Sequence, residues 1–223
     1  MTQNLNIIFF FIDVLILVFC FLFSIRIKKL NVSINSMKYF DIFFLVALFL
    51  LFLHISASTK ILSSEVYFWA NKLSVLFYFL FYCRFFYNVL NQSRKLTASF
   101  ILLSSFTSVG IILLLLIIKS NLPWYALVLS NLGLLFLSGV YFLDYLKGVD
   151  FKPLSKSPEF WVIFGISASS ILMIPVSLFI LVLEGHLLES HFLLLASVNQ
   201  LSFIFQYGAI IKAFLCIIQV QAK

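Results

Sequence analysis

The sequence contains little charge, little glycine or proline, and few cysteines. Charged residues make up 10% of the 223 positions and hydrophobic residues 63%, with 7 glycines, 4 prolines and 3 cysteines. A mean hydropathy of +1.14 is too high for a chain that must cover its surface with polar groups in water. Cys20, Cys83 and Cys216 stand in apolar segments without CxxC or histidine-paired spacing, so we expect no disulfide and no metal site.

Sequence motifs for hydrolysis are also absent. The chain has no GxSxG nucleophile elbow and no HExxH zinc helix. The net charge of +7 lies mostly in the connections between hydrophobic runs rather than along one helical face, so topology explains it better than nucleic-acid binding does. We therefore expect a protein that is not an enzyme, holds no cofactor and does not bind nucleic acid.

Long hydrophobic runs are what the sequence has in abundance. A membrane span takes about 20 apolar residues, so this length allows about seven spans joined by short loops. We predict an all-α, polytopic membrane bundle of seven transmembrane helices, forming a single domain over residues 1–223. The predicted spans are 5–25, 39–56, 66–90, 96–118, 124–146, 160–183 and 188–218.

Charges in the connections between these spans predict the orientation. Basic residues gather in the first, third and fifth connections, and cytoplasmic loops of membrane proteins carry such an excess. These residues are Arg26, Lys28, Lys29, Lys38, Arg94, Lys95, Lys147, Lys152 and Lys156. The second and fourth connections hold only Lys60 and Lys119. We predict an N-terminus outside and a C-terminus in the cytoplasm.

Four ionisable residues fall inside or at the ends of predicted spans, where charge is costly unless it is paired or faces a polar interior. At about 1.5 Å per residue, Asp13 lies about 12 Å and Lys72 about 9 Å below the outer surface, so depth allows them to pair. Asp41 and Arg84 match in the same way near the inner surface, although Arg84 can also extend to the headgroups. Structural pairing and a role in proton or ligand traffic both remain open.

Two polar stripes follow helical spacing in the third and seventh spans. The first stripe comprises Asn71, Ser74, Tyr78 and Tyr82. The second comprises Asn199, Ser202 and Gln206, and continues in Ala209 and Ala213. Such faces either pack against other helices, through amide hydrogen bonds and small residues, or line a pocket for a small molecule or lipid.

The sixth span carries signals for its start, its packing and its shape. A capping serine, a proline at the first helical position and an acidic residue in the first turn predict where it begins, at Ser157, Pro158 and Glu159. Gly165 and Ser169 form a small-xxx-small pair typical of close helix packing. Pro175 predicts a bend.

The segment Ser157-Pro-Glu-Phe-Trp-Val-Ile-Phe-Gly-Ile166 resembles the P-x-F-W-I-x-x-G entry to the sixth helix in a family of seven-helix bacterial membrane modules. That family includes sensor parts of two-component histidine kinases and small stand-alone proteins. The final span, with Asn199, Tyr207 and Lys212, is also similar to that family's last helix. The resemblance implies a stand-alone sensor module of a bacterial inner membrane, with a kinase partner.

The leading hypothesis is a non-enzymatic membrane sensor or anchor, surrounded by lipid, that couples to a protein partner through its cytoplasmic loops. One alternative is a transporter or lipid-handling protein with a polar interior lined by the third and seventh helices. Another is a structural subunit of a larger membrane complex.

Overall fold

Seven long helices account for nearly all of the structure, a computed structural model that describes residues 2–29, 35–58, 63–90, 94–117, 124–147, 154–183 and 189–221. The long helices are α1 (Thr2–Lys29), α2 (Phe40–Ser58), α3 (Ser64–Leu90), α4 (Arg94–Ile117), α5 (Trp124–Lys147), α6 (Pro158–Val182) and α7 (Glu189–Gln221). Two short 3₁₀ helices, η1 (Asn35–Met37) and η2 (Leu154–Lys156), precede α2 and α6. The predicted all-helical class is confirmed.

Six of the helices are long and apolar enough to cross a membrane, judged by length and composition. The qualifying stretches are Ile8–Lys29, Phe68–Leu90, Phe100–Ile117, Trp124–Leu146, Pro158–Val182 and Leu194–Gln219. In α2 the stretch Phe40–Leu53 is apolar but shorter, with only the described residues considered. The structure therefore has the helical pattern of an integral membrane protein.

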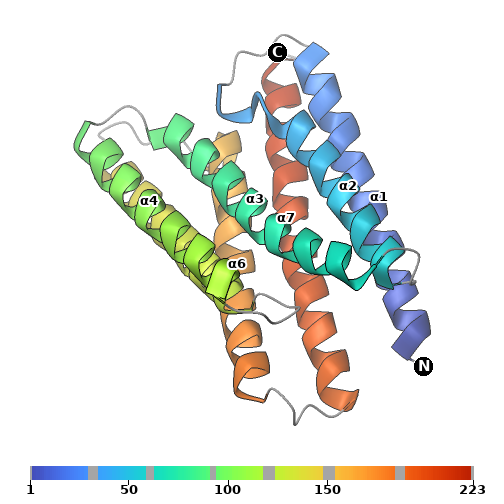
Figure 1. Ribbon diagram of the computed structural model, residues 1–223. Coiled ribbons are helices and arrows are strands. Elements are labelled where there is room, and N and C mark those ends of the chain that lie inside the picture. Colours follow the sequence, from blue (N-terminus) through green and yellow to red (C-terminus); the bar gives the residue numbers. More distant parts are fainter. Residues whose placement is uncertain are drawn as a thin grey trace.

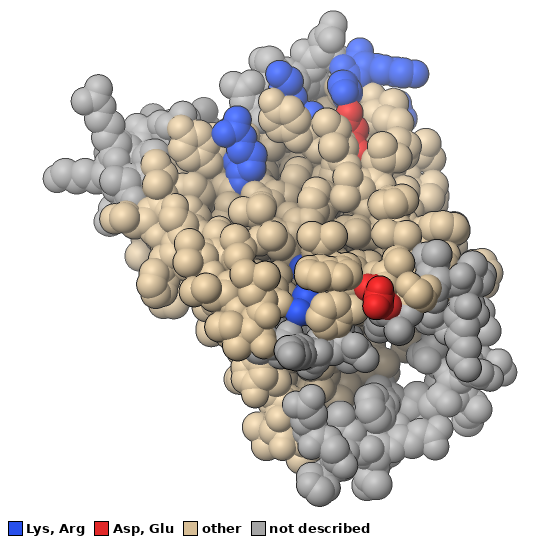
Figure 2. Space-filling model, viewed as in Figure 1, with Lys and Arg blue, Asp and Glu red and all other residues tan. Residues whose placement is uncertain are grey.

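Outward-facing side chains are large and apolar along most helices. Examples are Phe11 and Phe19 on α1, which are 60% and 56% exposed, and Leu102 and Phe106 on α4, at 73% and 80%. A soluble protein rarely exposes apolar surface on this scale, because water around it is unfavourable. On the face shown in Figure 2, Lys and Arg side chains gather toward the upper end, and most of the surface below them is uncharged. Such an apolar surface is suited to contact with the hydrocarbon chains of a lipid bilayer.

The helices run alternately up and down and close on themselves, so that the first packs against the seventh (Figure 1). The most extensive contacts are those of α6 with α7 and with α5. Helix α1 lies against α2 and α7, and α3 contacts α2, α4 and α5. The helix order places α3, α5, α6 and α7 around a shared interior.

Helix α6 begins as its sequence predicts. Ser157 is the N-cap, and its side-chain oxygen accepts a hydrogen bond from the backbone N–H of Phe160 at 3.3 Å. Pro158 takes the first turn, and Glu159 accepts a 3.2 Å hydrogen bond from Ser36 in η1. This last contact joins the first connection to the first turn of α6, where the fifth connection ends.

Several residues used to predict orientation lie outside the described part of the chain. These are Lys60, Lys119 and Lys152. For Arg94, Lys95 and Lys147 the helix is described but the side-chain environment is not.

Candidate functional site

A cavity of about 270 Å³ lies between α3, α5, α6 and α7. Its polar lining residues are Ser74, Tyr78 and Tyr82 of α3, Ser130 and Asn131 of α5, Ser169 and Ser170 of α6, and Asn199, Ser202, Gln206 and Tyr207 of α7. Its apolar lining residues are Val75, Phe79, Leu127, Leu134, Ile166, Met173 and Phe203. The structure thus brings three residues of the first predicted stripe and all three polar residues of the second into one cavity.

Asn71 of the first stripe stands apart from the cavity lining. Its backbone carbonyl accepts a 2.7 Å hydrogen bond from the Ser74 hydroxyl on the same helix. The stripe therefore meets the cavity only from Ser74 onward, because the cavity occupies the later turns of α3.

One side of the cavity is a hydrogen-bonded network that joins α6, α7 and α3. The Ser169 and Ser202 hydroxyls are 2.7 Å apart, and the Ser169 hydroxyl lies 3.3 Å from Oε1 of Gln206. Gln206 Nε2 donates to the Tyr82 hydroxyl at 2.6 Å. Next to it, the hydroxyls of Tyr78 and Tyr207 are hydrogen bonded to each other. Interhelical bonds of this kind hold membrane helices together at about 1 kcal/mol each.

Other polar lining residues, on α5, α6 and α7, bond only within their own helix or form no hydrogen bond among the described residues. Ser130 Oγ and Asn131 Nδ2 both donate to the carbonyl of Leu127, at 3.0 and 2.9 Å. Ser170 is 1% exposed and lines the cavity. Within the described part of the chain its hydroxyl forms no hydrogen bond, and neither does the Asn199 side chain.

The chemistry of the described lining is neutral, since it comprises hydroxyls, amides, a thioether, aromatic rings and aliphatic groups. No carboxylate, amine, guanidinium or imidazole is among the lining residues of this cavity. Within the described residues there is also no cluster of three or more metal-ligating side chains. The arrangement suits binding of an uncharged molecule better than acid–base catalysis, which needs a titratable group at the reacting atoms.

Gly165 brings α6 and α7 into close contact beside the cavity. A Cβ atom at this position would lie 2.7 Å from Ala209 Cβ and 2.9 Å from the backbone oxygen of Gln206. Ser169, one turn later, joins the network described above. Gly165 therefore allows close helix packing, and Ser169 contributes to the wall of the cavity. Helix α6 continues through Pro175, and the bend expected there stays a prediction.

Asp13 and Lys72 are not brought together as a pair: the structure gives each of them another partner. The Asp13 carboxylate accepts a 2.7 Å hydrogen bond from Gln200 Nε2 on α7. Depth in the membrane had matched Asp13 to Lys72, but α1 packs against α2 and α7, so its polar residue faces α7. The bond fixes α1 to the same stretch of α7 that carries Asn199 and Ser202.

Lys72 is 4% exposed, and its side chain contacts the C-terminal end of a neighbouring helix, α4. Its ammonium group donates to the backbone carbonyl of Leu115 and lies 4.0 Å from the centroid of the Phe68 ring. Leu115 is in the last turn of α4, where carbonyls lack a donor within the helix. A cation is also favourable at this negative end of the helix dipole, so the position of Lys72 has a structural explanation.

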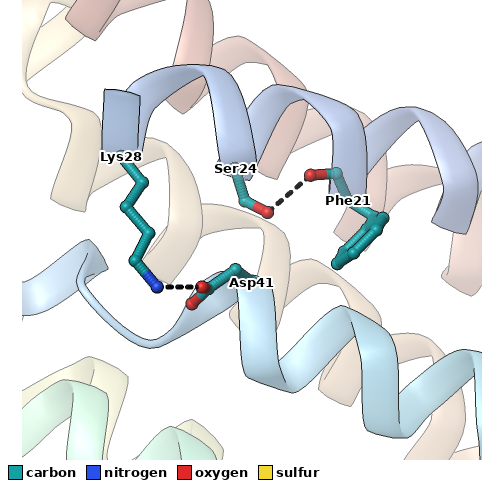
Figure 3. A network of polar contacts seen from close by, with 4 residues as sticks. All are labelled: Phe21, Ser24, Lys28 and Asp41. Carbon is teal, nitrogen blue, oxygen red and sulfur yellow. Dashed lines mark hydrogen bonds and ion pairs between the residues drawn. The ribbon is translucent and has the colours of Figure 1, made fainter. Parts of the chain in front are cut away.

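Asp41 and Arg84, the second candidate pair, are not brought together either. Asp41, at the start of α2, pairs with Lys28 at the end of α1, with Nζ and Oδ2 2.5 Å apart (Figure 3). In the same view Ser24 donates to the backbone oxygen of Phe21 at 2.7 Å. Arg84 is exposed and lies 5.6 Å from the centre of the Tyr87 ring. The short α1–α2 connection brings Lys28 to Asp41, whereas matching depth alone does not place Arg84 there.

Sequence reasoning overlooked the contributions of α5 and α6 to the cavity. Ser130, Asn131 and Ser170 were not part of either stripe, and Gln200 faces away from the stripe on its own helix. The signal for α5 was the adjacent Ser130 and Asn131 in an otherwise apolar span. Two neighbouring polar residues have no helical period, so a search for stripes passes over them.

Comparisons with known proteins give no relative for this chain. No protein-family model, no curated protein and no solved structure matches it. The resemblance to a seven-helix sensor family therefore rests only on residues 157–166 and on the final span. The cavity is the structural feature that bears most directly on function.

Proposed function

We propose that this chain is an integral membrane sensor module that binds a small uncharged molecule inside its helical bundle and transmits occupancy to a protein partner at its cytoplasmic end. The observation that carries the proposal is the cavity of about 270 Å³ with a neutral, hydrogen-bonding lining. Small-molecule sites are concave and mostly apolar, with a few placed polar groups, and they occur between the helices of bundles. This cavity has those properties.

The proposal includes seven spans, with the N-terminus outside and the C-terminus in the cytoplasm of a bacterial inner membrane. Helix α2 has 19 residues, or about 28 Å of helix, which is close to the thickness of the bilayer core. The contact between Ser36 and Glu159 holds the first and fifth connections at one end of the bundle. This agrees with a shared cytoplasmic side for the basic odd-numbered connections.

Neutral lining argues against the ion-transport form of the transporter hypothesis. An ion taken out of water costs several kcal/mol unless counter-charges meet it. Asp13 and Lys72, the residues considered for that role, lie outside the cavity lining and are bonded to Gln200 and to the Leu115 carbonyl. A ligand-sensing role uses the cavity as it stands.

The path from the cavity to the cytoplasmic end runs along α6 and α7. The two helices share the Ser169–Ser202 contact at the cavity. Toward the start of α6, Trp161 Nε1 donates to the carbonyl of Ser155 in η2 at 2.9 Å, and the Cys216 thiol of α7 meets the same carbonyl at 3.6 Å. A shift between α6 and α7 at the cavity would therefore reach the fifth connection. The sequence motif at the start of α6 favours a kinase as the partner.

Cysteine labelling in membranes tests whether small neutral molecules reach the cavity. In a background with Cys20, Cys83 and Cys216 replaced by alanine, Ser74→Cys should react readily with methyl methanethiosulfonate, which is small and uncharged. A thiol reacts as its thiolate, which forms only where the site is polar and reachable. Intact-protein mass spectrometry over time gives the rate.

Two matched serines serve as controls for this assay. Ser138 is buried in α5 outside the cavity lining, and Ser105 is on the exposed surface of α4. Both cysteine variants should react more slowly than Ser74→Cys. If Ser74→Cys is as slow as Ser138→Cys, small molecules do not reach the cavity and the sensor proposal fails. A cysteine added after Lys223 should react with a membrane-impermeant reagent only in opened cells, and labelling in intact cells would reverse the orientation.

A further inference from the structure

Hydrogen-bond partners divide the cavity into an occupied side and an available side. On α3 and α7, the amide of Gln206 is held between Tyr82 and Ser169, and Tyr78 is bonded to Tyr207. These groups satisfy one another across helices. A ligand that bonded to them would have to break bonds that hold the bundle together, so these groups offer little gain.

The α5–α6 side presents a donor and acceptors that protein groups leave open. The Ser170 hydroxyl is buried and forms no hydrogen bond within the described residues, so its O–H is available. Ser130 and Asn131 both donate to the Leu127 carbonyl, which leaves the Ser130 oxygen and Asn131 Oδ1 as acceptors for a ligand. A buried polar group without a partner costs about 1–3 kcal/mol, so an occupant that satisfies these groups is favoured.

The rest of the lining sets the character of the occupant. Phe79, Met173 and Phe203 are among seven apolar residues that would contact its body. With no ionic group in the lining, a charged occupant would lose its hydration without compensation. A volume of about 270 Å³ is just below the range of drug-sized sites, about 300–1,000 Å³, so the occupant is small.

Taking these observations together, we propose that the occupant is a small uncharged amphiphile with a hydroxyl or carboxamide head. The head accepts a hydrogen bond from Ser170 and donates one to Ser130 or Asn131. Its aromatic or aliphatic body lies against the apolar lining. This inference rests on the proposed ligand-sensing function and names the class of ligand for that same cavity.

Four probes with one apolar body and different heads test this class. 2-Phenylethanol and 2-phenylacetamide carry the two proposed heads, ethylbenzene carries none, and phenylacetate is charged at neutral pH. Each is tested for its ability to slow the labelling of Ser74→Cys in membranes. We expect the alcohol and the amide to protect at about fivefold lower concentration than ethylbenzene, and phenylacetate not to protect. Probe concentrations refer to the membrane phase, with the labelling of Ser105→Cys as the control for general partitioning.

The role of Ser170 is tested in the Ser74→Cys background by adding Ser170→Ala or, as a matched control, Ser167→Ala. Ser167 is on the same helix, bonds to the Ile163 carbonyl and does not line the cavity. Ser170→Ala should weaken protection by the alcohol and the amide about fivefold and leave ethylbenzene unchanged. Ser167→Ala should change none of the three.

Two outcomes would overturn the ligand class while leaving the sensor proposal intact. One is equal protection by ethylbenzene and 2-phenylethanol, which would make the site purely apolar. The other is rapid labelling of Ser74→Cys that no probe slows, which would mean that water alone fills the cavity. Failure of the sensor proposal looks different, because Ser74→Cys would then be labelled as slowly as Ser138→Cys.

Discussion

Two regions of this bundle, which share α3 and α7, are filled in opposite ways. Between α1, α2, α3 and α7 the interior is solid aromatic packing: Phe40 is fully buried, with the rings of Phe81, Phe85 and Phe214 within 6 Å in edge-on arrangements. Between α3, α5, α6 and α7 there is the cavity of about 270 Å³ with its hydroxyls and amides. Tyr207 belongs to both, since its ring is near Phe44 and its hydroxyl bonds to Tyr78.

The difference shows how side-chain shape decides where space is left. Aromatic rings are wide and rigid, so interlocked rings such as Phe43 and Phe81, 4.1 Å apart, fill the gap between helices. A small serine whose hydroxyl bonds back to its own helix, as that of Ser130 does, leaves space that a larger side chain would fill. The aromatic region should therefore respond to mutation in stability, and the cavity region chiefly in binding.

The largest effect is expected from Phe40→Ala in the aromatic region. Removing a fully buried ring leaves a hole that its ring neighbours cannot close, at a cost of about 3–5 kcal/mol in the free energy of unfolding. Phe52→Ala on the same helix is the control, because Phe52 is 63% exposed. Thermal unfolding of the purified proteins in detergent compares them. Similar losses in both variants would mean that the aromatic region is not the stable part of the bundle.

An intermediate effect is expected from Gly165→Ala. Gly165 is on α6 and contacts α7, the helix that belongs to both regions. The added methyl group would overlap Ala209 and the Gln206 backbone, which cannot swing aside, so α6 and α7 must separate at a cost of about 1–3 kcal/mol. Gly208→Ala is the control, since nothing lies within 4 Å of its added Cβ. Gly208→Ala should keep or raise the unfolding temperature. If Gly165→Ala does the same, the α6–α7 contact is looser than the structure indicates.

The smallest effect is expected from two buried serines. Ser177 is 0% exposed, and its hydroxyl has no partner within the described residues. Ser177→Ala should therefore stabilise the protein by about 1 kcal/mol, because a polar group is no longer left unsatisfied. Ser138, also buried, bonds to the Leu134 carbonyl, and Ser138→Ala should be nearly neutral. A destabilising Ser177→Ala would point to a partner for this hydroxyl that the described residues do not include.

Local signals in the sequence predicted the helices well. Hydrophobic runs located all seven, with ends within a few residues of those observed. The start of α6 was predicted from Ser157, Pro158 and Glu159, and the structure has Ser157 as the cap. These signals depend on residues close together in the chain, so one sequence contains all the information they need.

Contacts between helices were harder to predict, because depth and spacing do not give direction. Asp13 and Lys72 match in depth, but one faces α7 and the other the end of α4. The stripes on α3 and α7 gave the face of each helix, and the structure places their residues in one cavity. The facing side from α5 and α6 depends on the order of helices around the bundle, which no spacing along the chain encodes.

The contact of α1 with α7 has a consequence for how the protein is made. The chain is made from its N-terminus, so α1 has α2 as a neighbour early but meets α7 only after the helices between them have been made. Until then Asp13 has no access to Gln200, its hydrogen-bond donor. A nascent chain therefore carries this carboxyl group without its partner for most of its synthesis. The docking of α7 is the event that closes the bundle and supplies that partner.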